Sequence, residues 1–325
     1  MMSKAPLVFS SVKGEFRVDD PSSAVIGTGG YGVVYRGFQS DTKLPVAIKQ
    51  SKMSLERSIW KEVNAYSRIG PHQNIVEVIA HVAIPDSVSL IMALADCELF
   101  DYVCKKTMLA EAEARRLFHQ MLAAVEHIHA RYVVHCDIKL ENWLMFGDTL
   151  KLTDFGLSHI FKDGWSVTHL CRRVGSEHYV SPDVLRGTEY DAFASDTWSL
   201  SICLFAMCCG FFPYKLASGR DWRYSMFFNK TMCLVTSLFH HYNYDSDLSV
   251  QFRDLIHRSI GIRTNRLTLL DLKNHAWTVA ASSADAPQEV CIDKTNWKSL
   301  PAQETCDPPV LCKAKMITDV PCGAF

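Results

Sequence analysis

The stretch HCDIKLEN at residues 135–142, followed by DFG at residues 154–156, decides how the fold of this chain is interpreted. It brings four polar side chains into one short segment, namely Asp137, Lys139, Asn142 and Asp154. Carboxylate and amide oxygens of this kind suit magnesium, which is a hard cation. A lone aspartate in a loop is usually solvated or caps a helix, so the meaning of the stretch depends on the motifs that lie around it.

A glycine-rich segment, GTGGYGVV at residues 27–34, lies upstream. Its glycines let a backbone approach a phosphate closely and offer N–H donors without side chains in the way. A dinucleotide-binding fingerprint would need a helix directly after the glycines. Here β-branched and aromatic residues follow, then the polar turn QSDTK and a further strand, so we predict a glycine-rich hairpin.

The strand after this hairpin ends in Val46-Ala47-Ile48-Lys49. Lys49 is placed where an ammonium could meet the α- and β-phosphates of a nucleotide. A lysine in a partly closed cleft needs a carboxylate to stay charged and aimed. Glu62, on the helix predicted over residues 54–69, is the natural partner, and Glu56, near the first turn, is a less suitable rival.

In this order, the motifs resemble those of the eukaryotic protein kinase superfamily, serine/threonine type. The resemblance continues beyond DFG. Ser181-Pro-Asp183 stands where the family usually has Ala-Pro-Glu, Asp196-Thr-Trp-Ser matches the start of its large buried helix, and Arg266 matches the arginine that pairs with the Ala-Pro-Glu carboxylate. One of these motifs alone could arise by chance, but all of them in the correct order could not.

The resemblance implies an α+β fold with two lobes, which agrees with a sequence that predicts mostly strands in its first part and mostly helices in its second. We expect an N-terminal extension over residues 1–15 and a kinase domain over residues 16–280. Its β-rich N-lobe, with one regulatory helix, would span residues 16–94, and its mainly α-helical C-lobe residues 95–280. Residues 281–325 contain prolines and four cysteines at irregular gaps, and we expect a flexible tail; a zinc site there has weak support.

The resemblance also implies ATP and Mg²⁺ as cofactors, with Mn²⁺ as a substitute. Asp137 would orient the acceptor hydroxyl, Lys139 would reach the γ-phosphate, and Lys49 with Glu62 would hold the α- and β-phosphates. Asn142 and Asp154 would hold the metal. The residues expected around ATP are Gly27, Gly29, Gly30, Gly32, Val34, Ala47, Lys49, Met92, Ala93, Ala95, Glu98 and Leu144.

The expected partners are protein substrates. In the family, the D-x-K-x-x-N spacing that Lys139 completes is typical of serine/threonine kinases. Glu98 and Glu141 resemble glutamates that contact basic residues upstream of the acceptor in cyclic-AMP- and calmodulin-dependent kinases, so we expect the same preference. In the alternative interpretation, Glu98 contacts the ATP ribose and Glu141 is solvated.

Two departures from the family pattern leave an alternative open. Cys136 replaces the arginine that usually anchors a phosphate in the activation loop, so we expect activity without that phosphorylation. Asp183 is one methylene shorter than the usual glutamate. A pseudokinase that binds nucleotide and acts as a regulatory scaffold is therefore the alternative function, although Lys49, Asp137 and Asp154 are all present. A small-molecule phosphotransferase is less consistent with the motifs at 181–183 and 196–199.

Composition limits the remaining function classes. The chain has 325 residues, of which 48% are hydrophobic and 21% charged, and a formal net charge of −1. This balance argues against a nucleic-acid binder, which needs a basic surface. The longest apolar run, residues 198–214, is interrupted by polar residues, and we interpret it as a buried helix and not as a membrane span. Without a secretory signal, the expected location is the cytoplasm or the nucleus. Nothing in the sequence fixes an oligomeric state.

Overall fold

The computed structural model describes residues 5–29, 32–52, 56–84, 87–162, 169–229, 234–242, 248–261, 266–280 and Leu311. The described chain divides into two compact units. Unit 1 contains residues 5–102 and 123–162, and unit 2 contains residues 103–122 and 169–280 with Leu311. The predicted tail, apart from Leu311, lies outside the described residues, and so do its four cysteines.

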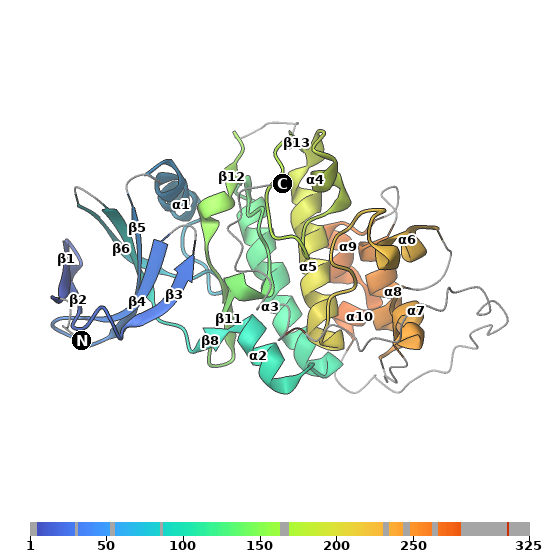
Figure 1. Ribbon diagram of the computed structural model, residues 1–325, viewed down its shortest axis with the longest axis horizontal. Coiled ribbons are helices and arrows are strands. Elements are labelled where there is room, and N and C mark those ends of the chain that lie inside the picture. The colour runs from blue at the N-terminus through green and yellow to red at the C-terminus, as the bar shows by residue number, and fades with distance from the viewer. Residues whose placement is uncertain are drawn as a thin grey trace. The chain divides into compact units, whose positions relative to one another are not determined.

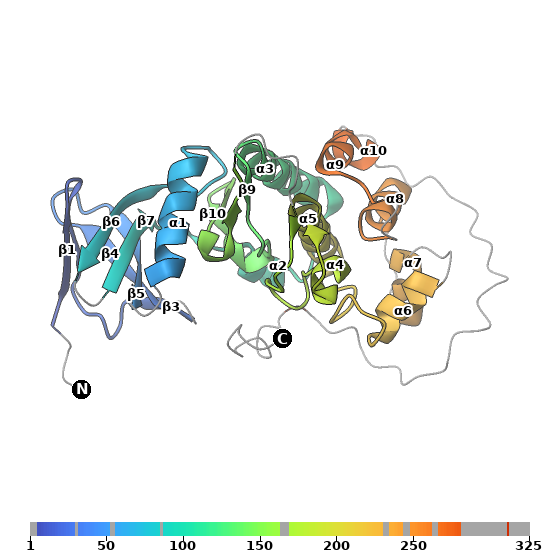
Figure 2. The same cartoon turned by 90° about the horizontal axis from the view of Figure 1, so that it is seen from above.

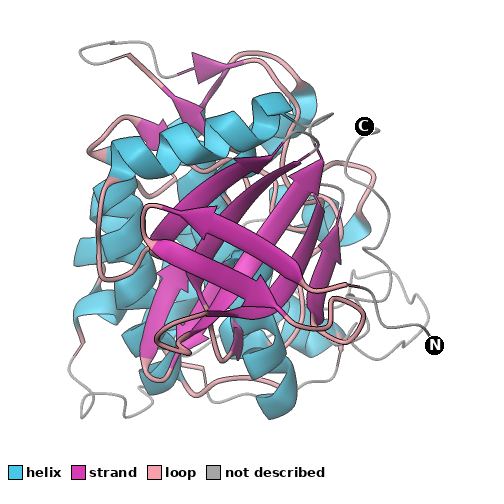
Figure 3. Cartoon of the chain, turned by 90° about the vertical axis from the view of Figure 1, so that its left-hand side faces the viewer, coloured by secondary structure: helices cyan, strands magenta, loops and turns pink. Residues whose placement is uncertain are grey.

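Unit 1 is built on a seven-stranded sheet (Figures 1 and 3). Its strands are β1 (Leu7–Ser11), β2 (Gly14–Val18), β3 (Val25–Gly29), β4 (Gly32–Gln39), β5 (Pro45–Lys52), β6 (Val78–Ile84) and β7 (Ser87–Ala93). The order is β1-β2-β4-β5-β7-β6, with β3 paired to β4. The predicted glycine-rich hairpin is present, because β3 pairs with β4 in antiparallel fashion, and β5 follows the polar turn and pairs with the other side of β4.

Side chains that alternate along the strands form the core of this sheet. Its buried members are Phe9, Phe16, Val18, Val46, Ile48, Val82 and Ile91. The aromatic rings of β1 and β2 thus pack on the strands that carry the nucleotide-site motifs. β1 lies within the predicted N-terminal extension and pairs with β2 along its whole length, so part of that extension belongs to the sheet.

Helix α1 (Glu56–Ile69) lies alongside the sheet (Figure 2). Val63 on this helix packs against the buried residues Val76, Leu90 and Met92. An amphipathic helix buries its apolar stripe on such a surface and leaves its charged face outside. One inward position carries a carboxylate instead: Glu62 is only 3% exposed.

Shorter elements complete unit 1 and carry the HCDIKLEN and DFG motifs. They are the strands β8 (Cys97–Glu98), β9 (Val133–Val134), β10 (Trp143–Phe146), β11 (Thr149–Leu152) and β12 (His159–Ile160), and the 3₁₀ turns η2 (Leu140–Asn142) and η3 (Phe155–Leu157). β10 pairs with both β11 and β8, and β12 pairs with β9. Helices α2 (Leu99–Lys106) and α3 (Glu111–His129) have residues in both units.

Unit 2 is mainly helical, as predicted. Its elements are β13 (His169–Leu170), α4 (Pro182–Arg186), β14 (Tyr190–Asp191), α5 (Ala192–Cys209), α6 (Trp222–Asn229), α7 (Leu234–His241), α8 (Val250–Ser259), α9 (Leu269–Asn274) and α10 (Ala276–Val279). In the described chain, α5 is the one helix long and apolar enough to cross a membrane, but 83% of it is buried inside the protein. Residues 198–209 of the apolar run therefore belong to a buried core helix, as the sequence predicted, whereas residues 210–214 follow the helix.

The ends of α5 show how local sequence sets this helix. The Asp191 side chain caps its first turn by accepting hydrogen bonds from the Phe193 and Ala194 N–H groups. Gly210 ends it with φ of 73°, and a Cβ at Gly210 would come within 2.4 Å of the Thr107 carbonyl oxygen. Only glycine fits this left-handed and crowded position.

The resemblance implied an ion pair between Asp183 and Arg266, and unit 2 forms it. Arg266 Nη2 lies 2.6 Å from Asp183 Oδ2. Arg186, on the same helix as Asp183, binds the other carboxylate oxygen. Although the aspartate is one methylene shorter than the usual glutamate, it still reaches both guanidinium groups.

Candidate functional site

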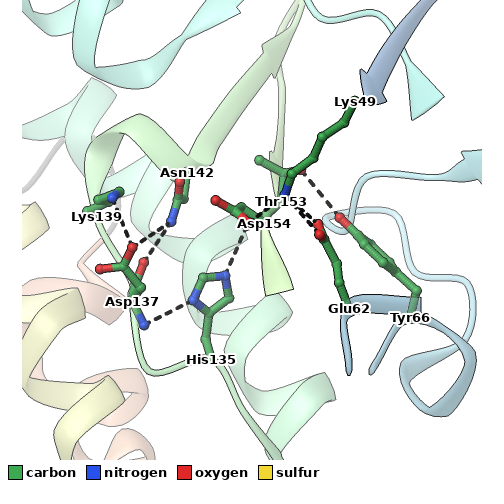
Figure 4. Close-up of polar contacts among 9 residues, drawn as sticks. All are labelled: Lys49, Glu62, Tyr66, His135, Asp137, Lys139, Asn142, Thr153 and Asp154. Carbon is green, nitrogen blue, oxygen red and sulfur yellow. Dashed lines mark hydrogen bonds and ion pairs between the residues drawn. The ribbon is translucent and has the colours of Figure 1, made fainter. Parts of the chain in front are cut away.

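Lys49 is the centre of an ion cluster in unit 1. It lies on β5, and the strand register places it opposite Val34 on β4. Its ammonium nitrogen is 2.8 Å from Glu62 Oε2 and 2.8 Å from Asp154 Oδ1 (Figure 4). The sheet supplies the cation, α1 supplies one carboxylate, and the DFG motif supplies the other. We call these three residues the Lys49 cluster.

Burial makes this cluster electrostatically demanding. Side-chain exposure is 12% at Lys49 and 3% at Glu62. Burial alone would lower the pKa of Lys49, but Glu62 and Asp154 outweigh it and raise the pKa above its ordinary value. Burial raises the pKa of Glu62 as well, against the attraction of the Lys49 ammonium. A buried ion pair of this kind is weak evidence for stability, and its cost is more consistent with a functional role.

Asp154 is held ionised. Burial would raise its pKa, but the Lys49 ammonium and its hydrogen bond dominate and lower the pKa to about 2. The residue also has a left-handed backbone, with φ of 64°. This conformation is uncommon outside glycine and concentrates at functional sites. Cys136, beside Asp137, shares it with φ of 65°.

The HCDIKLEN segment forms the second half of the site. Lys139 Nζ lies 2.9 Å from Asp137 Oδ2, and the Asn142 amide nitrogen donates to the Asp137 carbonyl oxygen at 2.8 Å. Burial would lower the pKa of Lys139, but Asp137 raises it above its ordinary value. The short turn η2 folds the segment back, so that Asn142 meets the aspartate five residues before it (Figure 4).

His135 and Thr153 join the two halves, and sequence reasoning had not given them a role. His135 Nδ1 accepts a hydrogen bond from the Asp137 N–H at 3.2 Å, so its Nε2–H donates to the Thr153 carbonyl at 2.9 Å. Tyr66, one turn beyond Glu62 on α1, approaches Thr153 Oγ1 at 3.3 Å through its hydroxyl group. A helical spacing of four from Glu62 was the available signal for Tyr66.

Asn142 and Asp154 fit a divalent cation. The backbone N–H of Thr153, the residue before Asp154, donates to the Asn142 carbonyl at 3.0 Å, so the two segments that carry Asn142 and Asp154 are held together. The Asn142 amide nitrogen donates to Asp137, and Asp154 Oδ1 accepts from Lys49. The candidate metal ligands are therefore Asn142 Oδ1 and Asp154 Oδ2. An ionised carboxylate and an amide oxygen are the donor types that Mg²⁺ prefers.

The other residues expected around ATP follow the strand registers of unit 1. The register pairs Val34 with Lys49, Ala47 with Met92, and Leu144 with Glu98. Met92 is buried, Ala93 and Ala95 are half-buried, and the Ala93 N–H donates to the Glu77 carbonyl at 3.3 Å.

The predicted glycines lie on the β3–β4 hairpin. Gly27, Gly29 and Gly32 are in its strands, whereas Gly30 lies outside the described residues. A Cβ at Gly32, where φ is 145°, would come within 2.1 Å of the Gln50 carbonyl oxygen. Close packing against β5 therefore requires glycine at position 32, in addition to the phosphate role that the sequence predicted.

Comparison with known proteins identifies the family. The protein kinase domain family matches residues 22–278. Among curated proteins, serine/threonine protein kinase OSK3 of Oryza sativa subsp. indica is 32% identical over 261 residues, which cover 78% of this chain and 48% of that protein. Serine/threonine-protein kinase SIK2 of Gallus gallus is 29% identical over 282 residues, covering 84% of this chain and 34% of that protein.

A third relative, the carbon catabolite-derepressing protein kinase of Saccharomyces cerevisiae, is 33% identical over 196 residues, or 58% of this chain and 30% of that protein. The chain belongs to the protein kinase domain family, of the serine/threonine type, and it has the α+β fold that this membership implies. It spans about half the length of the rice relative, and about a third of the other two.

Proposed function

We propose that this protein transfers the γ-phosphate of ATP to serine or threonine hydroxyls of protein substrates, with Mg²⁺ as the required cation. The observation that carries this proposal is the Lys49 cluster beside the Asp137–Lys139–Asn142 loop, all within unit 1. The relatives, whose printed names call them serine/threonine protein kinases, support the same class.

Phosphoryl transfer requires alignment and charge stabilisation more than covalent chemistry. Asp137 accepts the proton of the acceptor hydroxyl or orients it, and its ion pair with Lys139 fixes where the carboxylate points. Lys139 meets the charge that develops on the γ-phosphate. Lys49, aimed by Glu62, binds the α- and β-phosphates.

Mg²⁺, when bound with ATP, neutralises charge on the β- and γ-phosphates. Asn142 and Asp154 would hold it, since their oxygens fit this role. The lowered pKa of Asp154 keeps its carboxylate ionised across the physiological range, so the site needs no deprotonation before it accepts a cation.

We further propose that basic residues upstream of the acceptor improve a substrate. Glu141 lies in the turn η2 and is close enough to Lys139 to influence its pKa, which places a negative charge beside the transfer site. Glu98 lies on β8 opposite Leu144. A peptide library should show selection for arginine or lysine before the acceptor, and Glu141→Gln should weaken it. The exposed Glu126 supplies a matched control, since Glu126→Gln should leave the selection intact.

The deciding experiment compares wild type with Asp137→Asn. Each protein is incubated with Mg²⁺, labelled ATP and a mixed basic protein substrate, and the labelled amino acid is then identified. A group that positions or accepts the proton is worth roughly 10²–10⁴-fold in rate. We expect label on serine or threonine with wild type, and a loss of that size in the variant.

The opposite results separate the proposal from its alternative. Nucleotide binding without transfer by wild type, across several substrates, would support a pseudokinase that acts as a regulatory scaffold. Label that persists unchanged in Asp137→Asn would contradict the role of Asp137.

A further inference from the structure

A contact network in unit 1, remote from the phosphate site, fixes the C-terminal end of α1. His127, on α3, places its Nε2 atom 3.0 Å from the carbonyl oxygen of Ile69, the last residue of α1. The last four carbonyls of a helix have no partner within it. A side chain from another helix therefore satisfies one of these groups at the end of α1.

The protonation state of His127 follows from its other neighbour. Arg131 Nη1 lies 3.1 Å from His127 Nδ1, and a second bond joins the same guanidinium nitrogen to the His127 carbonyl. Arginine can only donate, so Nδ1 must be an acceptor and the proton must sit on Nε2. A neutral imidazole in one tautomer thus donates to α1 and accepts from Arg131.

The segment that follows α1 closes the network. The ring of His72 stacks on that of His127, with centroids 4.3 Å apart and a tilt of 32°. His72 Nδ1 accepts the Asn74 N–H at 3.1 Å. Arg68, in the last turn of α1, donates to the Arg131 carbonyl at 3.1 Å. In the described chain, the ionisable groups against His127 are therefore His72, from the segment after α1, and Arg131, from the turn that follows α3.

We propose that His127 is a positioning residue for phosphotransfer, which as a neutral imidazole anchors α1 so that Glu62 stays aimed at Lys49. This inference rests on the proposed function. Glu62 and Ile69 are seven residues apart on one helix, or about two turns, so the anchored end sets where the carboxylate lies. Tyr66 lies between them and contacts Phe155 and Thr153, which extends the effect to the DFG segment.

Acid should release the anchor. A second proton on His127 would sit on Nδ1, against the Arg131 guanidinium, so one hydrogen bond would be lost and two cations would face each other. Burial lowers the pKa of both His127 and His72, and the Arg131 guanidinium acts in the same direction; the hydrogen bond to Ile69 opposes this at His127 but does not outweigh it. Both rings are therefore neutral at neutral pH, and they gain protons only as the pH falls below the ordinary histidine value of about 6.5.

The test uses two substitutions and a control, each made in the whole 325-residue chain. His127→Gln keeps a donor for Ile69 and an acceptor for Arg131 but cannot titrate, whereas His127→Ala removes both bonds. His119→Gln changes an exposed histidine on the same helix and serves as the control. Transfer rates are measured from about pH 5.5 to about pH 8, across the range in which histidine titrates.

We expect His127→Ala to lower kcat/KM by about fivefold at neutral pH, the factor for losing the one hydrogen bond, to Ile69, that reaches α1. His127→Gln should retain most of the rate and lose less of it on acidification than wild type or the control. An acid limb identical in wild type and His127→Gln, or full activity in His127→Ala, would overturn the proposal.

Hydrogen exchange of α1 amides supplies a readout that needs no activity. At neutral pH, α1 should exchange faster in His127→Ala than in His127→Gln, while β4 and β5 stay protected in both and so exclude global unfolding. If neither wild type nor the variants transfer phosphate, but α1 exchanges faster in His127→Ala than in His127→Gln, the proposed function fails and the anchoring of α1 stands. Equal α1 exchange in the two variants would contradict the anchoring.

Discussion

Two carboxylate–cation clusters, one in each unit, differ in their charge balance. In the Lys49 cluster of unit 1, one ammonium faces two carboxylates, Glu62 and Asp154. In unit 2, one carboxylate, Asp183, faces the guanidinium groups of Arg186 and Arg266, and we call this set the Asp183 cluster. The first carries an excess of negative charge and the second does not.

This difference separates a site from a structural brace. A partly buried group with an uncompensated negative charge attracts a further cation, which agrees with the Mg²⁺ role proposed for Asp154. The Asp183 cluster needs no further cation, and the Arg266 guanidinium also lies 4.8 Å from the ring of Trp198 in buried α5. Substitutions in the first cluster should therefore affect activity, and substitutions in the second should affect stability.

The largest effect should follow Asp154→Asn. The amide keeps the size of the side chain but loses the charge that holds the cation, so we expect kcat to fall roughly 10²–10³-fold, as for loss of one electrostatic catalytic group. The Lys49–Glu62 pair remains, and the fold should persist. Steady-state transfer assays with circular dichroism of the same samples would check both parts. Unfolding of the variant, in place of inactivity in a folded state, would contradict the distinction between the clusters.

Asp183→Asn should show the opposite profile. Two guanidinium groups would lose their shared carboxylate, and breaking a buried pair on one side costs about 3–5 kcal/mol of unfolding free energy. Because the Asp183 side chain is 14% exposed, we expect about 3 kcal/mol. Urea denaturation at neutral pH measures this value. A stability equal to that of wild type would show that the Asp183 cluster makes no net contribution to the unfolding free energy.

Acid should remove the contribution of the Lys49 cluster to the unfolding free energy as Asp154 becomes protonated. The pKa of Asp154 is about 2 in the folded protein and 3.8 ordinarily, so its contribution is present above about pH 4 and is lost as the pH falls towards 2. The shift corresponds to about 2 kcal/mol, reduced to about 1 kcal/mol because the side chain is 31% exposed. Denaturation of wild type and Asp154→Asn over this range should show a difference that disappears in acid. A constant difference would argue against the lowered pKa.

The smallest effect concerns the support of the Asp183 cluster. Ser181 caps α4, the helix that carries Asp183, by accepting a hydrogen bond from the Val184 N–H. Ser181→Ala should lower the unfolding free energy by about 1 kcal/mol, the usual value of such a cap. Kinetic constants should change little when measured below the unfolding transition. A loss larger than that of Asp183→Asn would reverse the predicted order of the two contributions.

The same contrast explains what the sequence could predict. The partnership of Lys49 with Glu62 was predictable, because a buried lysine needs a carboxylate and one helix offered it at an inward position. The buried helix at residues 192–209 was predictable from its apolar run. In both cases one dominant force, either charge pairing or apolar burial, acts on residues that the sequence displays openly.

Other features depend on contacts between distant segments, and their sequences carry little signal. His127 looks like one of several helical histidines until the fold brings Ile69 and Arg131 against it. The second arginine of the Asp183 cluster, Arg186, is a surface-like residue whose role appears only with the geometry of α4. The residues of β1 were assigned to an extension, because the core position of Phe9 depends on packing against strands that come later in the chain.

The most direct test of the central claim is calorimetric titration of ATP into wild type and Asp154→Asn, each with and without Mg²⁺. If the Lys49 cluster is a phosphate and cation site, wild type should bind ATP more tightly with Mg²⁺, and the variant should lose most of that gain. ATP affinity that does not depend on Mg²⁺ in wild type, or a gain preserved in Asp154→Asn, would contradict it.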